Sequence, residues 1–432
     1  MKEEHWRARR ARAARAVVLA LLIALGLACR LDAAADFNAR HPDNGSWLRG
    51  DESSYDDLAR AFIAGNGFNW PGRVPLYPMW LGVIYWWSDG SYHAVGRAQA
   101  FLVVPFTVLA YLLGRAVFGP LVGLVTAAFA SLSPTDIGWG TRLYSEALYA
   151  PVLLGVLLAF WRAMRRPSAA RFFWAGALLG ASNLVRPGLL FFPPFLLLYL
   201  PRRFRWRAVT RYGGLYLGAS VLVVTPWVIH NYLKYDALLA LQASHAILWQ
   251  GSPEYYHLVR DQGYTYMRVW DEIIYGPGWK ALDPNSVAGD RYWTRRAFQS
   301  IAREPFVYLR YACEKLFTLW IGDPNADWGD SRIFDWRALR RLGYSRRQAT
   351  EYMALRVLPL IALLAVVMLR RHTRYLAPLY LVLAYTTLLH AATHAEARLS
   401  DPLQPVLVML VAGAVQRECR RKRDGRGRRG AE

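Results

Sequence analysis

The sequence predicts an α-helical polytopic membrane protein, a bundle of about ten transmembrane helices with extracytoplasmic loops that carry interfacial helices. Long apolar segments recur along the 432 residues, and 54% of all side chains are hydrophobic. A helix needs about 20 apolar residues to cross a bilayer, and several of these segments are that long. The basic residues gather in the short connections between them. This composition excludes a disordered chain, and three cysteines exclude a small disulfide scaffold.

The first crossing is predicted at 16–35, where apolar residues follow the basic stretch 1–15. It could instead be a cleaved signal peptide, because Ala33-Ala34-Ala35 resembles a signal-peptidase site. We expect a retained helix, and both alternatives place the chain from residue 36 onward outside the cytoplasm. The remaining nine crossings are predicted near 94–114, 119–138, 143–161, 172–186, 188–201, 212–230, 354–369, 375–391 and 402–416.

The distribution of charge sets the predicted orientation. The chain has 53 Lys and Arg against 31 Asp and Glu, a formal net charge of +22. Basic residues near helix ends are retained in the cytoplasm. With both termini inside, the cytoplasmic segments, including the basic tail 417–432, account for this entire charge. No basic patch is left over for a groove-binding face, which argues against nucleic acid as a partner.

Two long segments are predicted outside the membrane, 36–93 and 231–353, and they flank a transmembrane bundle at 94–230. In the first, Val74–Trp87 is apolar, but it is short and contains prolines, so we expect an interfacial helix. In the second, 306–321 carries charged residues and is placed at the interface as well. The basic run Arg337–Arg347 would favour the cytoplasm, which leaves a true span at 306–321 as the alternative. The C-terminal transmembrane helices occupy 354–416.

An acidic stretch follows the first predicted crossing, beginning at Gly50-Asp51-Glu52. A carboxylate at this place can face both a membrane-embedded substrate and an aqueous one, which suits a general base. Alternatively, Asp51 caps a helix that begins at Ser53 or Ser54, because Asp is a favoured N-cap residue.

The motif around Asp51 resembles the first extracytoplasmic loop of the GT-C glycosyltransferases of the dolichyl-phosphate-mannose–protein mannosyltransferase and aminoarabinose-transferase type. In that family a Gly-Asp, a Tyr four residues later, an Ala, a Gly-x-Gly-Phe and a Tyr-Pro follow in order. Two positions depart from the family pattern: His230 replaces an Arg, and Leu399 replaces a Tyr. The matching parts are Gly50-Asp51, Tyr55, Ala59, Gly65-Asn66-Gly67-Phe68, Tyr77-Pro78, Ser133-Pro134, Ser145-Glu146, Arg186-Pro187, Thr225-Pro226-Trp227, Leu248-Trp249-Gln250-Gly251, Glu304-Pro305 with Lys315, and Glu396-Ala397-Arg398.

The resemblance implies a GT-C-like bundle that transfers a sugar from a polyprenyl-phosphate donor to a lipid, glycan or protein acceptor, with inversion at the anomeric carbon. The active site would be extracytoplasmic, in a bacterial inner membrane. Asp51 would be the general base, with Glu146 as a second catalytic carboxylate. The leaving phosphate gains negative charge and calls for cations, which Arg186, Lys315 and Arg398 could supply. No cofactor is certain, and a divalent metal is compatible with this chemistry but not indicated.

Each of these candidates also has a structural interpretation. Glu146 could cap a helix start, although an unpaired carboxylate in an apolar segment is costly. Long cations at helix ends commonly reach for the interface, which would explain Arg186, Lys315 and Arg398 without a ligand. The predicted substrate-binding residues could be packing residues instead: Tyr55, His230, His245 and Trp249.

Two other functional classes remain open on the sequence alone. A secondary transporter would also have about ten helices, but it would need polar or broken sites at mid-membrane. The acidic residues gather outside instead. A non-catalytic scaffold of a cell-envelope assembly would keep the topology without needing Asp51.

Overall fold

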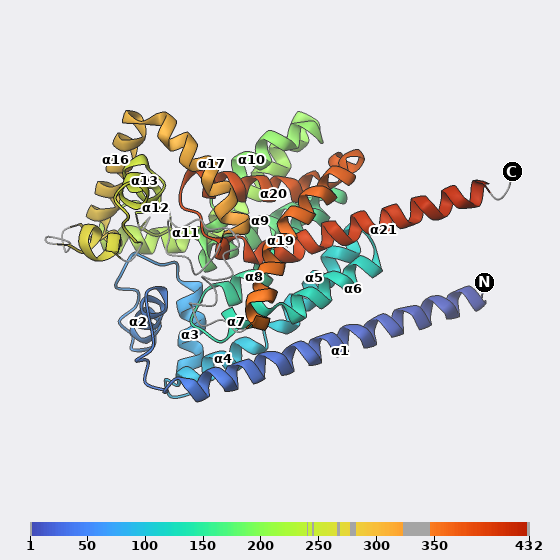
Figure 1. The fold of residues 1–432 in the computed structure, drawn as a ribbon, viewed down its shortest axis with the longest axis horizontal. Coiled ribbons are helices and arrows are strands. Elements are labelled where there is room, and N and C mark those ends of the chain that lie inside the picture. The colour runs from blue at the N-terminus through green and yellow to red at the C-terminus, as the bar shows by residue number, and fades with distance from the viewer. Residues whose placement is uncertain are drawn as a thin grey trace.

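The computed structural model describes residues 2–239, 241–243, 246–265, 268–276, 282–322 and 346–429, and these residues form helices joined by short connections. The predicted all-helical architecture is thereby confirmed (Figure 1). The main helices are α1 (Lys2–Arg40), α2 (Asp51–Ile63), α3 (Leu76–Trp87), α4 (Tyr92–Ala100), α5 (Val103–Val117), α6 (Pro120–Leu132), α7 (Pro134–Gly140), α8 (Glu146–Arg165), α9 (Ala169–Val185), α10 (Phe192–Tyr199), α11 (Trp206–Tyr235), α12 (Ile247–Gln250), α13 (Pro253–Arg260), α16 (Val287–Arg303), α17 (Pro305–Ile321), α19 (Arg346–Met368), α20 (Thr373–Ala392) and α21 (Gln404–Arg429).

Six helical stretches within the described residues are long and apolar enough to cross a membrane, and the bent pair α6 and α7 raises the number to seven. The predicted count of ten is not confirmed. The predicted crossing at 188–201 is broken into the 3-10 turns η1 (Pro187–Leu189) and η2 (Leu200–Arg202) with the eight-residue α10 between them. Prolines at 187, 193, 194 and 201 explain the breaks, because proline has no N–H to donate within a helix.

The two chain termini project from the same end of the molecule (Figure 1). The long helices α1 and α21 extend to this end, and both carry runs of arginine there. Helices α2, α12, α13 and α16 lie toward the opposite end. The basic ends of the chain are therefore well separated from the segments predicted to lie outside the membrane.

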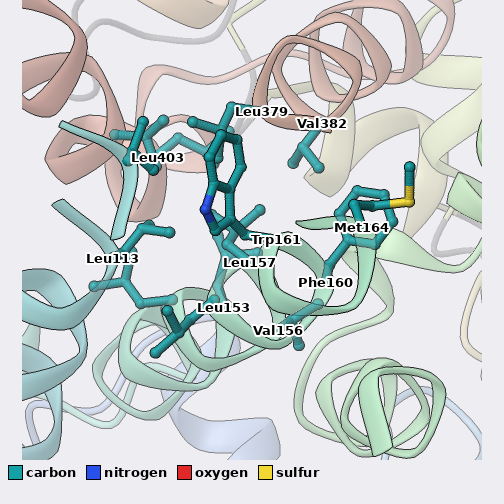
Figure 2. Packing of buried hydrophobic residues seen from close by; sticks show 14 of the residues in the cluster. Leu113, Leu153, Val156, Leu157, Phe160, Trp161, Met164, Leu379, Val382 and Leu403 are labelled. Atoms are coloured by element: carbon teal, nitrogen blue, oxygen red, sulfur yellow. The ribbon is translucent and has the colours of Figure 1, made fainter. Parts of the chain in front are cut away.

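The core of the bundle surrounds α8. This helix and the last candidate span, Ala397–Lys422, are the most deeply buried of the six candidate spans. Its apolar side chains, including Leu153, Leu157 and Trp161, pack against residues of α5, α20 and the segment before α21 (Figure 2). A smaller, separate core lies in the segment predicted to be outside the membrane, where Trp249 of α12 packs on Trp293 of α16. The α8 core fixes the helix whose first residue is Glu146.

Helix α9 lies unusually close to α11. A side chain at Gly176 would collide with the carbonyl oxygen of Tyr216, and a Cβ at Gly180 would lie 2.7 Å from the carbonyl oxygen of Ser220. Small residues at such positions let helix backbones approach closely in membranes. Because α9 ends at Val185, this contact also determines where Arg186 emerges.

Candidate active site

Asp51 is the first residue of α2, and the N-cap position before it is occupied by Gly50. Gly50 precedes the helix with a φ of +52°, a conformation that favours glycine, and the helix begins two residues before Ser53. The carboxylate instead forms two ion pairs, from Oδ1 to Arg73 Nη2 at 2.5 Å and from Oδ2 to Arg398 Nη2 at 3.0 Å. The capping alternative therefore does not describe Asp51, whose side chain remains 31% exposed.

Glu146 is the first residue of α8, the N-cap position before it is Ser145, and its Oε2 atom accepts from Ser145 Oγ at 3.4 Å. Its Oε1 atom lies 2.6 Å from Arg186 Nη1 and 3.8 Å from Arg398 Nη1, and the side chain is only 3% exposed. Arg186 directly follows α9, so the end of α9 and the start of α8 meet at this pair. Both side chains point into the protein, which argues against the snorkelling interpretation of Arg186.

Arg398 joins the two carboxylates. It lies in the 3-10 turn η5 (Ala397–Leu399), between α20 and α21, and it is mostly buried. Besides Asp51 and Glu146, it contacts Glu396, with its Nε atom 2.9 Å from Oε2. Glu396 in turn accepts a contact from His394 Nε2 at 3.0 Å. Arg398 therefore connects segments that are about 350 residues apart in the sequence.

The charges of this cluster balance. Three carboxylates, Asp51, Glu146 and Glu396, face three guanidinium groups, and burying such charges is tolerable only when they are paired. We call these residues the charge cluster: Asp51, Arg73, Glu146, Arg186, Glu396 and Arg398. The sequence prediction missed Arg73 and Glu396. Glu396 belongs to the late family motif and Arg73 lies two residues before the proline-rich one, but neither position indicated a role as an ion-pair partner.

Tyr55 packs at the border of the charge cluster. Its hydroxyl donates to Ser145 Oγ at 3.2 Å, and Arg73 lies 5.0 Å from its ring centroid. Burial raises the pKa of the Tyr55 hydroxyl, although the charge of Arg73 opposes this effect. The ring also packs edge-on against Tyr77. Tyr55 therefore helps to place Ser145, the residue before Glu146, while it contacts the arginine that holds Asp51.

Lys315 lies apart from the charge cluster. Its Nζ atom is buried and donates to the backbone carbonyls of Gly251 at 3.2 Å and Thr393 at 2.7 Å. Within the described residues no carboxylate lies within ion-pair distance of it. Burial lowers the pKa of Lys315 to about 7. The side chain does not snorkel toward an interface, and it does not face Arg186 or Arg398 directly.

The remaining predicted substrate-binding residues lie in packed surroundings or outside the described residues. His230 stacks on Trp227, with ring centroids 4.8 Å apart, and lies edge-on to Phe68. Trp249 is fully buried, and its Nε1 donates to Glu254 Oε2 at 2.8 Å. His245 lies outside the described residues. In the part of the chain that the structure describes, no group of three or more His, Cys, Asp or Glu could hold a metal ion.

A sequence comparison finds a family model that matches part of the chain. Residues 75–230 match the family model of dolichyl-phosphate-mannose-protein mannosyltransferases. The predicted resemblance is confirmed. The mannosyltransferase match includes Glu146 and Arg186, and it leaves out Asp51, Lys315 and Arg398. No curated protein sequence matches the chain.

Two solved structures align with most of the chain. The crystal structure of ArnT from Cupriavidus metallidurans, bound to undecaprenyl phosphate, shares 14% identity over 92% of this chain and 77% of that one, with a TM-score of 0.42. The oligosaccharyltransferase of Archaeoglobus fulgidus, in complex with zinc and sulfate, shares 15% identity over 90% of this chain, with a TM-score of 0.37. The chain spans 53% of the length of that oligosaccharyltransferase.

Proposed function

We propose that this protein is a membrane glycosyltransferase that moves a sugar from a polyprenyl-phosphate donor to a lipid, glycan or protein acceptor at the extracytoplasmic face. The observation that carries the proposal is the ion pair between Asp51 and Arg398, which places a partly exposed carboxylate against a buried cation. The mannosyltransferase match supports the reaction class, and dolichyl-phosphate-mannose is a sugar on a lipid-linked phosphate.

Asp51 is the proposed general base. It accepts the proton of the acceptor nucleophile as that atom attacks the anomeric carbon from the face opposite the phosphate. The bond between the anomeric carbon and the phosphate oxygen breaks, and its electron pair leaves on the phosphate, so the configuration inverts. A positioned base contributes about 10²–10⁴-fold to the rate of such a step.

Exposure favours Asp51 over Glu146 as this base. The Asp51 side chain is 31% exposed, whereas that of Glu146 is 3% exposed and lies between Arg186 and Arg398. An acceptor that arrives from the aqueous side can therefore reach Asp51 more easily. In this proposal Glu146 serves catalysis by holding the two arginines in place.

Arg398 and Arg186 are the proposed ligands of the donor phosphate. Charged donors that are already oriented stabilise the charge that develops on a leaving group, because they need not reorganise during the reaction. Arg398 lies 3.0 Å from Asp51, so the proposed phosphate site and the proposed base are neighbours. The lipid tail would extend into the bilayer beside the ends of α8 and α9.

The orientation of the active site is part of the proposal. The predicted cytoplasmic segments carry the whole net charge, and the arginine-rich ends of α1 and α21 project from one end of the molecule, away from α2 (Figure 1). This arrangement supports an active site on the side opposite the basic termini, which the positive-inside rule places outside the cytoplasm.

The direct test is transfer by the purified protein. We expect a labelled polyprenyl-phosphate sugar, incubated with the protein and an envelope extract, to lose its label to an acceptor, and the Asp51→Asn variant to lose this transfer. Movement of the labelled lipid across vesicle membranes without transfer would favour the transporter alternative. No transfer and no movement with any polyprenyl-phosphate sugar would leave the scaffold alternative.

A further inference from the structure

Lys315 carries a buried amine that has no carboxylate within ion-pair distance among the residues that the structure describes. It is 3% exposed, and its Nζ atom contacts two carbonyl oxygens and lies 4.6 Å from the Tyr311 ring centroid and 5.6 Å from that of Tyr308. Burying an amino group without a countercharge is costly, so its hydrogen bonds must compensate for the lost water. The side chain is therefore held by a specific pair of backbone acceptors.

The two acceptors belong to segments that are distant in the sequence. Gly251 directly follows α12 and Thr393 directly follows α20, so Lys315 ties α17 to the ends of both helices. The backbone of Gly251 approaches Thr393 so closely that a side chain at Gly251 would collide with the Thr393 carbonyl oxygen. The carbonyl groups at the end of a helix find no N–H donor within the helix, so they accept from outside donors. Lys315 supplies one for Thr393.

Thr393 begins the short path that leads to the charge cluster. The next residue, His394, contacts Glu396, and Glu396 contacts Arg398, which pairs with Asp51. On the other side of Arg398, the buried Asp401 pairs with Arg356 at 3.2 Å. The segment that presents Arg398 is thus anchored before and after this residue.

We propose that Lys315 is a positioning residue that fixes the 393–398 segment and thereby aims Arg398 at the donor phosphate. The identity of the ligand in this inference rests on the proposed function, whereas the anchoring of the 393–398 segment does not depend on it. It differs from a direct contact of Lys315 with phosphate, because Nζ faces carbonyl oxygens that belong to the protein. A direct ligand would act through its charge, whereas a positioning residue acts through the carbonyl it holds.

Two variants separate these roles. Lys315→Met keeps the length of the side chain but cannot donate to Thr393. Gly251→Ala retains the charge of Lys315 and disturbs the same contact by its methyl group. Arg310→Met is the matched control, since Arg310 lies on the same helix, is 73% exposed and contacts only Glu314 among the charged residues described. Hydrogen exchange of residues 393–399, followed by mass spectrometry, reports on the anchoring without any need for activity.

We expect exchange in 393–399 to rise about tenfold in Lys315→Met and in Gly251→Ala, with no change in Arg310→Met. Affinity for polyprenyl phosphate should fall about tenfold in the same two variants, and Lys315→Met should add little when Arg398 is already alanine. Unchanged exchange in Lys315→Met would overturn the positioning role. The role would also be overturned if Lys315→Met bound polyprenyl phosphate more weakly while Gly251→Ala showed normal exchange and normal binding. If exchange rises but the wild-type protein binds no polyprenyl phosphate, the anchoring stands and the proposed function fails.

Discussion

Replacement of Asp51 by asparagine is the sharpest test of the proposed mechanism. Asparagine has nearly the same shape but cannot accept a proton at neutral pH. Asp51 now accepts from Arg73 through one oxygen and from Arg398 through the other. Since asparagine offers a single oxygen, one of these two charge-assisted contacts is lost.

The expected magnitudes follow from this geometry. Loss of one hydrogen bond to a charged group should lower the free energy of unfolding by about 1.5–3 kcal/mol. Loss of the base should lower turnover by about 10²–10⁴-fold, which corresponds to about 3–5 kcal/mol in the activation barrier. Binding of polyprenyl phosphate should not weaken, because the variant removes a carboxylate that competes for Arg398.

The assay combines single-turnover transfer from a labelled polyprenyl-phosphate sugar with binding of the unlabelled lipid and thermal melting in detergent. Asp57→Asn is the matched control, because Asp57 is an exposed residue of the same helix. Glu52 is a poor control, since it is fully buried and pairs with Arg142 at 2.7 Å. Wild-type turnover in Asp51→Asn would refute the assignment, and loss of donor binding with retained turnover of the bound fraction would make Asp51 a structural anchor.

Three further predictions concern the phosphate site, pH and topology. Arg398→Ala should weaken binding of polyprenyl phosphate by about 30-fold or more, since a charged contact contributes about 2–4 kcal/mol, and unchanged affinity would remove Arg398 from the site. Between about pH 7, the lowered pKa of Lys315, and its ordinary value of 10.5, the unfolded chain binds more protons at this residue than the folded one. The melting temperature in detergent should therefore rise from pH 7 to pH 9 more in the wild type than in Lys315→Met. The titratable groups that lie near the amine, His390, His394, Tyr308 and Tyr311, are present in both proteins. Equal rises in the two proteins would contradict the lowered pKa of Lys315. Single cysteines at the exposed positions Asn44 and Asn66, in a chain without its three native cysteines, should react with an impermeant reagent from outside the cell. Labelling only after the cytoplasmic face is opened would reverse the orientation.

The sequence located much of the charge cluster but not its internal contacts. Asp51, Glu146, Arg186 and Arg398 lie in four separate motifs, and the family resemblance pointed to all of them. Nothing local indicates that Arg73 and Glu396 complete the cluster, because an ion-pair partner is determined by how distant segments pack. The same limit applies to Lys315: its place on a helix was evident, but not whether it faces lipid or two carbonyl groups.

Hydropathy predicted the class of fold better than the number of spans. The segment 188–201 is as apolar as a transmembrane helix, yet its prolines divide it into short pieces. Trp249 shows a similar ambiguity, since an aromatic residue in a family motif could stack on a sugar or fill a core. Its contact with Trp293 depends on the tertiary packing of distant segments, which no local sequence pattern indicates.

The close packing of α9 on α11 makes the position of Arg186 sensitive to substitutions far from the charge cluster. Arg186 follows the last turn of α9, so its place depends on how near α9 can approach its neighbour. The two helices can approach this closely because Gly176 and Gly180 have only a hydrogen atom as a side chain. No charged group is involved in this contact between the two glycines and α11. A single added methyl at Gly176, ten residues before Arg186, would push the helix outward and draw the guanidinium away from Glu146. A substitution at a glycine can thus displace Arg186 from the charge cluster although every residue of that cluster is still present in the sequence.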